Sequence, residues 1–315
     1  MEGVTLLSLI IPIYRNEENL PRLLEALTSL NAQLQGNFEV VFSVDGSPDR
    51  CYELLREQLP RAAFRSTLLL LSRNFGSFSA ITAGLEAARG EYFAALAADL
   101  QEPPELALRF LEILSAGEAD IVFGSREHRS DPFLTEIASS TFWSLFRRYI
   151  IQDMPRGGVD VFGCNTAVRN RILTFRESNT NLIALLFWIG FRRAYVGYER
   201  RSRQEGKSAW TWRKKLRYSI NSIFNFTDIP ITLLFYCGGF ALLLAILGIL
   251  TVLFARITGR IQVPGYTPIV LSVMFFGALT SIGLGVIGQY LWLTLQNTRQ
   301  RPNYIVQEIQ YFDAN

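Results

Sequence analysis

The fold is decided near the start of the chain by residues 6–30, which read LLSLIIPIYRNEENLPRLLEALTSL. Leu6–Ile13 is an apolar run of strand length, and polar residues end it. Leu20–Leu30 then carries leucines three and four residues apart, which is the spacing of a helix with one apolar face. A strand followed directly by a helix is the repeating unit of an α/β fold.

The same alternation continues outward through the first 130 residues. Further apolar runs predict strands at Phe38–Val44, Thr67–Leu71, Tyr92–Ala97 and Asp120–Gly124. Helical patterns lie between them, at Asp49–Leu59 (with Ser47-Pro48 as its start), Phe78–Ala88 and Leu106–Ser115. We therefore predict a mostly parallel sheet covered by helices, whose ligands bind at the carboxyl ends of the strands.

Charge is distributed unevenly along the chain. Only six of the 59 charged residues lie in the last 87 positions, and residues 229–255 and 261–298 carry none. A membrane-spanning helix needs roughly 20 apolar residues, so we predict spans at Ile231–Phe254 and Thr267–Leu293. This pattern excludes a disordered chain and a wholly soluble enzyme. The three cysteines have no paired spacing, which argues against a disulfide scaffold, and a net charge of +3 is too small to indicate nucleic acid.

Basic residues predict the orientation of the spans. Positions 200–217 hold eight Lys or Arg and one acid, whereas the turn between the spans holds two Arg. Basic loops stay in the cytoplasm, so both termini are expected there. Residues 137–151 and 210–227 have helical amphipathic patterns; the first suits an ordinary packed helix as well as an interfacial one, and the second suits a helix at the membrane surface.

Polar clusters follow four of the predicted strands. They are Glu17, Asp45-Gly46-Ser47, the stretch Ser72–Gly76, and Asp99-Leu100-Gln101-Glu102. A carboxylate at the end of an apolar strand, such as Asp99, is costly unless a cation or hydrogen-bond donors meet it. Asp99 with the carbonyl of Gln101 fits Mg²⁺ or Mn²⁺ bound to a nucleotide, which takes few protein ligands besides phosphate oxygens.

Two other phosphate-binding motifs are excluded by missing glycines. The turn after the first strand, Pro12–Glu18, contains none, so a dinucleotide-binding fold is not expected. Gly206-Lys207-Ser208 resembles the end of a phosphate loop, but Arg201 stands where that motif requires its first glycine.

These clusters together resemble the motifs of one enzyme family. Pro12-x-Tyr14-x-Asn16-Glu17, Asp45-Gly46-Ser47, Ser72–Gly76 and Asp99–Glu105 are similar to those of the GT-A, family 2 polyprenyl-phosphate glycosyltransferases. That family includes dolichol-phosphate mannose synthases and bacterial undecaprenyl-phosphate glucosyltransferases. The resemblance covers essentially the whole chain, including Arg203-x-x-Gly206-x-Ser208-x-Trp210 and two closing spans.

The resemblance implies an organisation in four parts. A Rossmann-like GT-A catalytic domain occupies residues 1–205, an interfacial helix 206–228, two transmembrane helices 229–298, and a cytoplasmic tail 299–315. The protein would lie in the inner membrane with its catalytic domain and both termini in the cytoplasm.

The resemblance also implies residue roles. Pro12, Tyr14, Glu17 and Asp45 would line the pocket for the nucleotide base and ribose, and Asp99 and Gln101 would hold Mg²⁺ or Mn²⁺ on the diphosphate. Asp160 matches the acidic residue near the reacting sugar. The acceptor phosphate would be bound by Arg126, Ser139, Arg203 and Ser208, with residues 126–136 as the acceptor loop.

The implied reaction is inverting transfer of a sugar from a nucleotide-sugar to a polyprenyl phosphate, undecaprenyl or dolichyl. UDP-hexoses such as UDP-glucose or UDP-GlcNAc are favoured, and the product would serve cell-envelope or O-antigen modification. Homo-oligomers and a separate flippase are further implied partners, besides membrane lipid. Two alternatives stay open: a processive polysaccharide synthase, and a catalytically silent membrane scaffold. The scaffold is motivated by Ala97, where the family usually has the first Asp of Asp-x-Asp, and by Ala209, where it usually has Lys.

Overall fold

The computed structural model describes residues 6–126, 155, 159–175, 181–199, 229–258 and 266–314. The chain divides into two compact units. The first consists of residues 1–211 together with residues 302–315, and the second of residues 212–301. The carboxyl-terminal segment therefore belongs to the same unit as the amino-terminal strands.

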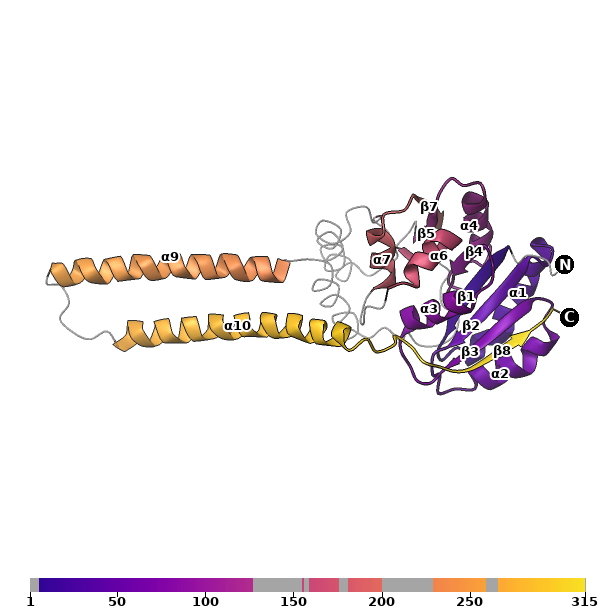
Figure 1. The fold of residues 1–315 in the computed structure, drawn as a ribbon, viewed down its shortest axis with the longest axis horizontal. Coiled ribbons are helices and arrows are strands. Elements are labelled where there is room, and N and C mark those ends of the chain that lie inside the picture. The colour runs from indigo at the N-terminus through magenta and orange to yellow at the C-terminus, as the bar shows by residue number, and fades with distance from the viewer. Residues whose placement is uncertain are drawn as a thin grey trace. The chain divides into compact units, whose positions relative to one another are not determined.

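The first unit is built on an eight-stranded sheet in the order β7-β5-β6-β4-β1-β2-β3-β8 (Figure 1). Neighbours β1–β2, β1–β4, β2–β3 and β5–β7 are parallel, whereas β4–β6, β5–β6 and β3–β8 are antiparallel. The mostly parallel sheet expected from the sequence is confirmed. The strands are β1 (Leu7–Ile13), β2 (Phe38–Val44), β3 (Arg65–Leu71), β4 (Tyr92–Ala95), β5 (Ile121–Arg126), β6 (Val159–Asn165), β7 (Arg193–Tyr198) and β8 (Val306–Phe312).

Helices cover both faces of this sheet. Odd-numbered residues of β1 share one core cluster with the buried residues of α1 (Leu20–Gln33), α2 (Cys51–Gln58) and α4 (Leu106–Ser115). The opposite face meets α3 (Ser77–Ala87), where a Cβ on Gly84 would lie 2.4 Å from Ile10 Cγ2. The remaining short elements are η1 (Glu17–Asn19), η2 (Leu59–Arg61), α6 (Thr166–Ile172) and α7 (Leu182–Trp188).

The predicted strands and helices of the first 130 residues are all present, with one informative shift. The helix expected from Asp49 begins at Cys51. Ser47 does not cap it, because its hydroxyl donates to Asp49 Oδ1 and accepts the N–H of Arg15 instead. The polar residues ahead of α2 thus connect two loops rather than start a helix.

Within residues 299–315, which were expected as a tail, Val306–Phe312 form a strand that the sequence analysis did not predict. β8 pairs antiparallel with β3, from Ser66↔Phe312 to Leu71↔Val306. It lies along β3 at the edge of the sheet (Figure 1). Glu308, Gln310 and Phe312 are half-buried, while Ile309 and Tyr311 are exposed.

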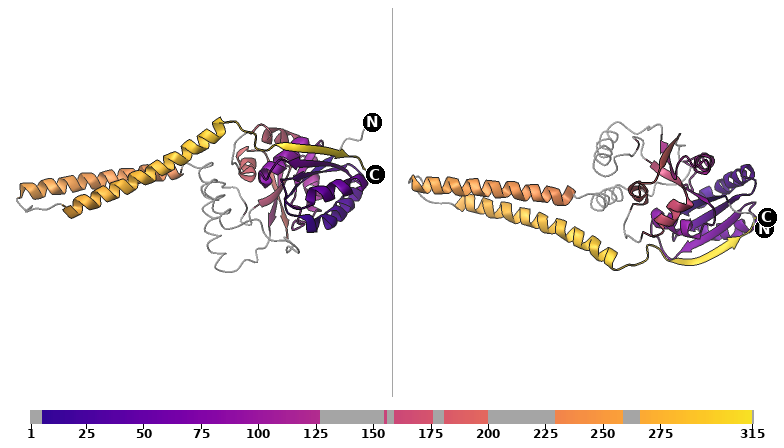
Figure 2. Two further views of the ribbon diagram at one scale, coloured as in Figure 1. Left: turned by 90° about the horizontal axis from the view of Figure 1, so that it is seen from below. Right: turned by 45° about the horizontal axis from the view of Figure 1, so that its top comes forward.

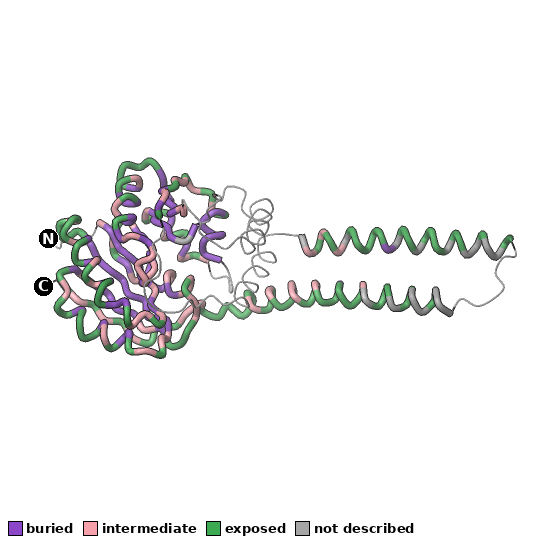
Figure 3. The backbone as a smooth tube through the Cα atoms, turned by 180° about the vertical axis from the view of Figure 1, so that it is seen from behind, coloured by how far each residue is buried: buried purple, intermediate pink, exposed green. Residues whose placement is uncertain are grey.

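The second unit contains two long helices, α9 (Ile229–Ile257) and α10 (Tyr266–Thr298), which run side by side (Figure 2). They contain the predicted spans, and both have stretches long and apolar enough to cross a membrane, Pro230–Gly248 and Phe275–Thr298. Figure 3 shows most of their described residues as exposed, whereas the strands of the first unit are buried. Such long apolar surfaces without a protein covering suit contact with lipid.

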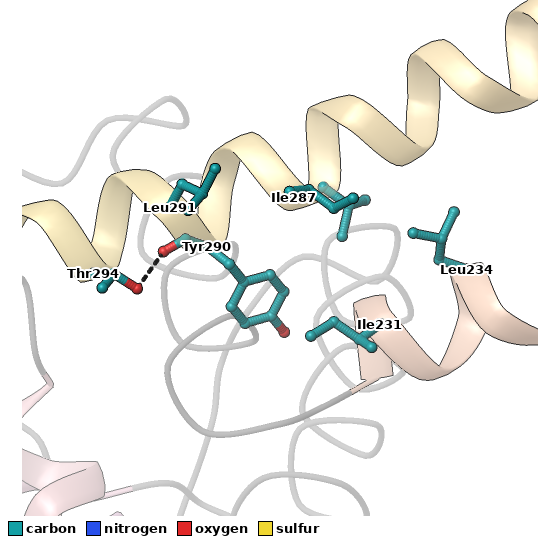
Figure 4. Close-up of a pocket in the computed structure, with 7 residues that line it drawn as sticks. Ile231, Leu234, Ile287, Tyr290, Leu291 and Thr294 are labelled. Carbon is teal, nitrogen blue, oxygen red and sulfur yellow. Dashed lines mark hydrogen bonds between the residues drawn. The ribbon is translucent and has the colours of Figure 1, made fainter.

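The two long helices leave an apolar groove between the beginning of α9 and the last turns of α10. Its volume is about 530 Å³, and the ring of Tyr290 points from α10 toward Ile231 of α9 (Figure 4). The lining residues are Ile231, Leu234, Val286, Ile287, Tyr290, Leu291 and Thr294.

A charged cluster lies where β5 and β7 begin, at the opposite end of these strands from the predicted site. Asp120, just before β5, accepts hydrogen bonds from Arg192 Nε (3.0 Å), the Arg192 backbone N–H (3.2 Å) and Asn165 Nδ2 (3.0 Å). The hydrogen bond from the Arg192 side chain is the largest of the effects that hold the pKa of Asp120 below its ordinary value of 3.8.

Asp120→Asn should therefore make the protein less stable in a pH-dependent way. A carboxyl with a lowered pKa stabilises the fold above its unfolded pKa, and this stability is lost as the pH falls through the folded pKa. In thermal unfolding of the detergent-purified protein, the wild type should melt about 2 °C higher between neutral pH and about pH 4, a small shift because Arg192 is solvent-exposed. The two curves should converge below that pH. An equal difference at all pH values would contradict this assignment.

Candidate active site

The sheet topology gathers the predicted site residues at one edge. β1, β2, β3, β4 and β5 all run in the same direction, so their carboxyl ends meet there. β6 runs the opposite way, and its first residues therefore lie at the same edge, with Val159 beside Ser125 of β5. This places at one edge the backbone of Tyr14, Asp45, Asp99, Arg126 and Asp160.

The loop after β1 is held by the loop after β2. The N–H of Arg15 donates to Ser47 Oγ (2.7 Å), and the N–H of Glu17 donates to Asp49 Oδ2 (3.3 Å). Glu17 in turn accepts the N–H of Arg50 through Oε2 (3.0 Å). Glu17 was predicted to line the nucleotide pocket, and one of its carboxylate oxygens fixes the start of α2.

Asp49 is the hub of these contacts. Burial opposes its ionisation, but hydrogen bonds from Ser47, Cys51 and backbone N–H groups together hold its pKa below the ordinary value of 3.8. It therefore stays an acceptor at neutral pH. The loop it supports carries Tyr14, which is half-buried, with the guanidinium of Arg15 5.5 Å from the centre of its ring.

Asp45 is the most deeply buried of the predicted site carboxylates whose side chains are described, with 2% of its surface exposed. Its Oδ1 accepts the N–H of Phe75 (2.7 Å) and its Oδ2 accepts that of Gly76 (2.8 Å). Burial raises its pKa, and these two hydrogen bonds oppose that rise. Gly76 directly precedes α3, so the carboxylate lies at the amino end of a helix, where negative charge is favoured.

The loops after β2 and β3 are in close contact beside Asp45. Gly46 has φ +55°, and a Cβ there would lie 2.3 Å from the carbonyl carbon of Arg73. Only glycine fits both the backbone angle and the space. The guanidinium of Arg73 lies 4.1 Å from the centre of the Phe75 ring. The sequence analysis named residues 72–76 as a motif but predicted no role for them. In the structure they surround Asp45.

Asp99 follows β4 in a tight turn. Leu100 has φ +54°, and the N–H of Gln101 donates to Asp99 Oδ1 (3.3 Å). Asp99 is half-buried, and Ala97 beside it offers no ligand. The described residues contain no group of three His, Cys, Asp or Glu that could hold a metal ion alone. One carboxylate in this position still fits Mg²⁺ or Mn²⁺ if the ion takes its other ligands from a diphosphate and water.

The remaining predicted site residues are described in part. Pro12, predicted for the nucleotide pocket, lies in β1 beside Ser43 of β2, and Arg126, predicted for the acceptor phosphate, is half-buried beside Tyr198 of β7. The backbone of Asp160 is fixed in β6. Ser139, Arg203 and Ser208 lie outside the described residues, as do positions 127–136 of the predicted acceptor loop and the stretches 137–151 and 210–227.

Comparison with known proteins gives consistent relatives along the whole chain. A putative glycosyltransferase of Bacillus subtilis, CsbB, is 32% identical over 303 residues, covering 96% of this chain and 92% of its own length. The undecaprenyl-phosphate 4-deoxy-4-formamido-L-arabinose transferase of Pectobacterium carotovorum is 29% identical over 314 residues, covering 98% and 94%. The prophage bactoprenol glucosyl transferase homolog of Escherichia coli is 28% identical over 306 residues, covering 96% and 99%.

A solved structure and a family model each match part of the chain. The S. aureus protein TarS, residues 1–349 in complex with UDP-GlcNAc, aligns with 71% of this chain and 67% of its own at 17% identity and a TM-score of 0.45. Residues 8–175 match the model of glycosyl transferase family 2. This range contains β1 from its second residue and the whole of β2, β3, β4, β5 and β6. The strand order, the polar loops at one edge and this match agree: the chain belongs to glycosyltransferase family 2 and has its GT-A α/β fold.

Proposed function

We propose that this glycosyltransferase moves a sugar from a nucleotide-sugar to a polyprenyl phosphate at the cytoplasmic face of the inner membrane. The observation that carries the proposal is the combination, in one chain, of a polar sheet edge and two apolar helices long enough to cross a bilayer. Relatives named as undecaprenyl-phosphate and bactoprenol transferases match over nearly the full length, apolar helices included.

The donor side of the proposed site lies over β1 and β2. Pro12, Tyr14, Glu17 and Asp45 would surround the base and ribose of the nucleotide, with UDP favoured over GDP. The hydrogen bonds around Asp45 and Asp49 support this role, because they fix the two loops before any ligand arrives. A rigid pocket loses less entropy on binding than a mobile one.

The metal would be held by Asp99 and Gln101. When bound, Mg²⁺ or Mn²⁺ would neutralise the charge that develops on the departing nucleoside diphosphate. The half-buried position of Asp99 supports this role, because a partly desolvated carboxylate gains more from a cation than an exposed one.

The acceptor needs no strong general base. A phosphate monoester has a second pKa near 6, so it is largely doubly ionised at neutral pH. Arg126, with Ser139, Arg203 and Ser208, would bind this phosphate against the repulsion of the donor diphosphate. A phosphate oxygen then forms a bond to the anomeric carbon while the bond to the diphosphate breaks on the opposite side, which inverts the configuration. Asp160 would orient the sugar or support the positive charge on its carbon.

The apolar helices explain how such an acceptor is reached. A polyprenyl chain is costly to extract from lipid, at roughly 0.8 kcal/mol per CH₂, so the enzyme must meet it in the membrane. The two spans, with residues 206–228 as an interfacial helix, would keep the catalytic domain at the cytoplasmic surface. Homo-oligomers and a separate flippase for the product complete the proposal.

A donor screen tests the proposed function. Membranes containing the protein, polyprenyl phosphate and Mn²⁺ should convert at least one labelled UDP-sugar into a chloroform-soluble product, identified by mass spectrometry as a polyprenyl-phosphate sugar. Label that stays in the aqueous phase with every UDP- and GDP-sugar would favour the silent scaffold, and a growing polysaccharide would favour a processive synthase.

Substitutions around Asp99 test the metal site. Asp99→Asn should lower turnover about 100-fold or more, because it removes the charged ligand from a site that stabilises the leaving group. Ala97→Asp places a second carboxylate two residues away and should lower the Mn²⁺ concentration for half-maximal rate. An activity that persists in chelator and is unchanged in Asp99→Asn would refute metal binding here.

Asp160→Asn tests the role beside the sugar. Loss of a charge that acts mainly in the transition state should lower kcat about 100-fold and leave the KM of both substrates within about threefold. Asp313→Asn, in the exposed segment after β8, is the matched control and should keep full activity. Near-normal turnover of Asp160→Asn would remove this residue from the mechanism.

A further inference from the structure

The chain returns from the apolar helices to the donor side of the proposed site. α10 ends at Thr298 and β8 begins at Val306. The carbonyl of Ile305, one residue before β8, accepts the N–H of Ser72 at 3.0 Å. Ser72 is the first residue after β3 and opens the loop that contacts Asp45.

This loop, residues 72–76, is therefore held from two sides. At its end, Phe75 and Gly76 donate to the carboxylate of Asp45, and Asn74 Nδ2 donates to the Asp45 carbonyl (3.3 Å). At its beginning, the N–H of Ser72 donates to the carbonyl of Ile305. Hydrogen bonds therefore hold the loop at both ends, to Asp45 at one and to Ile305 at the other. Ile305 belongs to residues 304–312, which we call the return segment.

Side chains of the return segment reach α3, the helix that follows the loop. The hydroxyl of Tyr304, a half-buried residue, donates to the carboxylate of Glu86 in α3. The guanidinium of Arg89, just beyond α3, lies 4.3 Å from the centre of the Tyr311 ring in β8. Residues 304–312 thus contact β3, the loop and the region around the end of α3.

The return segment adds little to the hydrophobic core. In β8 only Phe312 packs against the main core cluster, while Ile309 and Tyr311 are 40% and 54% exposed. Hydrophobic stabilisation scales with the apolar area that is buried, so the main effect of this segment falls on the backbone that it contacts.

We propose that residues 304–306 act as a strap that positions residues 72–76 beside Asp45, so that binding of a nucleoside diphosphate depends on the segment that follows the second apolar helix. The proposal rests on the proposed function, which places the donor beside Asp45, the residue that this loop contacts. The strap residues are positioning residues, because they act through Ser72 and α3 rather than by touching the substrate.

Two matched pairs of variants of the full-length, detergent-purified protein test the strap. Ser72→Pro removes the backbone N–H that Ile305 accepts, whereas Ser72→Ala keeps it; Leu71 is already extended, as a residue before proline prefers. A chain ending at Arg301 lacks the strap and β8, whereas a chain ending at Phe312 keeps both. Asp45→Asn serves as the reference for release of the loop from its other side.

Three measurements separate positioning from general destabilisation. Hydrogen exchange reports the order of the Phe75 and Gly76 amides without any ligand, calorimetry reports binding of UDP with Mn²⁺, and kinetics report the KM of donor and acceptor. In Ser72→Pro and in the chain ending at Arg301, both amides should exchange faster. In Ser72→Pro the Kd for UDP and the donor KM should rise about five- to tenfold, the factor expected for one lost backbone hydrogen bond. In the chain ending at Arg301 they should rise at least as much.

In Ser72→Pro the acceptor KM and the melting temperature should stay near the wild-type values. The chain ending at Arg301 also loses the pairing of β3 with β8, so its melting temperature should fall while its acceptor KM stays near the wild-type value. The two control variants should match the wild type throughout. Unchanged exchange at Phe75 and Gly76 in the chain ending at Arg301 would overturn the strap. So would equal rises in donor and acceptor KM together with a lower melting temperature. If the wild type transfers no sugar from any donor, the proposed function fails, but hydrogen exchange still decides whether the strap orders the loop.

Discussion

The loops on the proposed donor side of the site depend on one buried carboxylate. Asp45 is almost fully shielded from water, and a carboxylate in that position destabilises the fold unless donors satisfy it. The donors are the N–H groups of Phe75 and Gly76, which have no helical partners of their own because they precede the first turn of α3. The carboxylate thus gains two donors, and the two N–H groups gain an acceptor. These hydrogen bonds fix the loops after β2 and β3 together, and only glycine at position 46 permits their close approach.

Fixed loops matter because the proposed chemistry brings two anions together. A diphosphate and a phosphate monoester repel each other, and each also loses hydration on entering the site. Pre-placed charges and dipoles offset that cost better than mobile ones, since they need no reorganisation during the reaction. Arg126, Asp99 and the amino end of α3 lie at the same sheet edge because the strand directions bring them there. The strand directions thus bring these two charged side chains and the positive end of a helix dipole to the same edge of the sheet.

The sequence patterns predicted those strands and helices whose formation depends on residues close together in the chain. β1, β2 and α4 were located from apolar runs and helical periodicity, because each buries its own side chains in the core. Ser47 was interpreted as a helix cap, yet it contacts the loop of Arg15, a partner 32 positions away that no local pattern reveals. The strand character of β8 is similarly set by the free edge of β3. The hydrogen bonds from the backbone N–H groups of Phe75 and Gly76 to Asp45 could not be predicted, because a backbone N–H is the same in almost every residue type.

The two junctions between the units have different consequences. The chain passes from the first unit to the second at residues 211–212 and returns at residues 301–302. After the second junction, the chain becomes part of the central sheet within a few residues, at Ile305 and Val306. The chain between β7 and β8, which includes both apolar helices, is closed into a large loop by this pairing, and the entropy of closure is lost once, on folding. The residues that follow the second apolar helix therefore belong to the hydrogen-bonded structure of the first unit, and Ile305 accepts the N–H of Ser72 there.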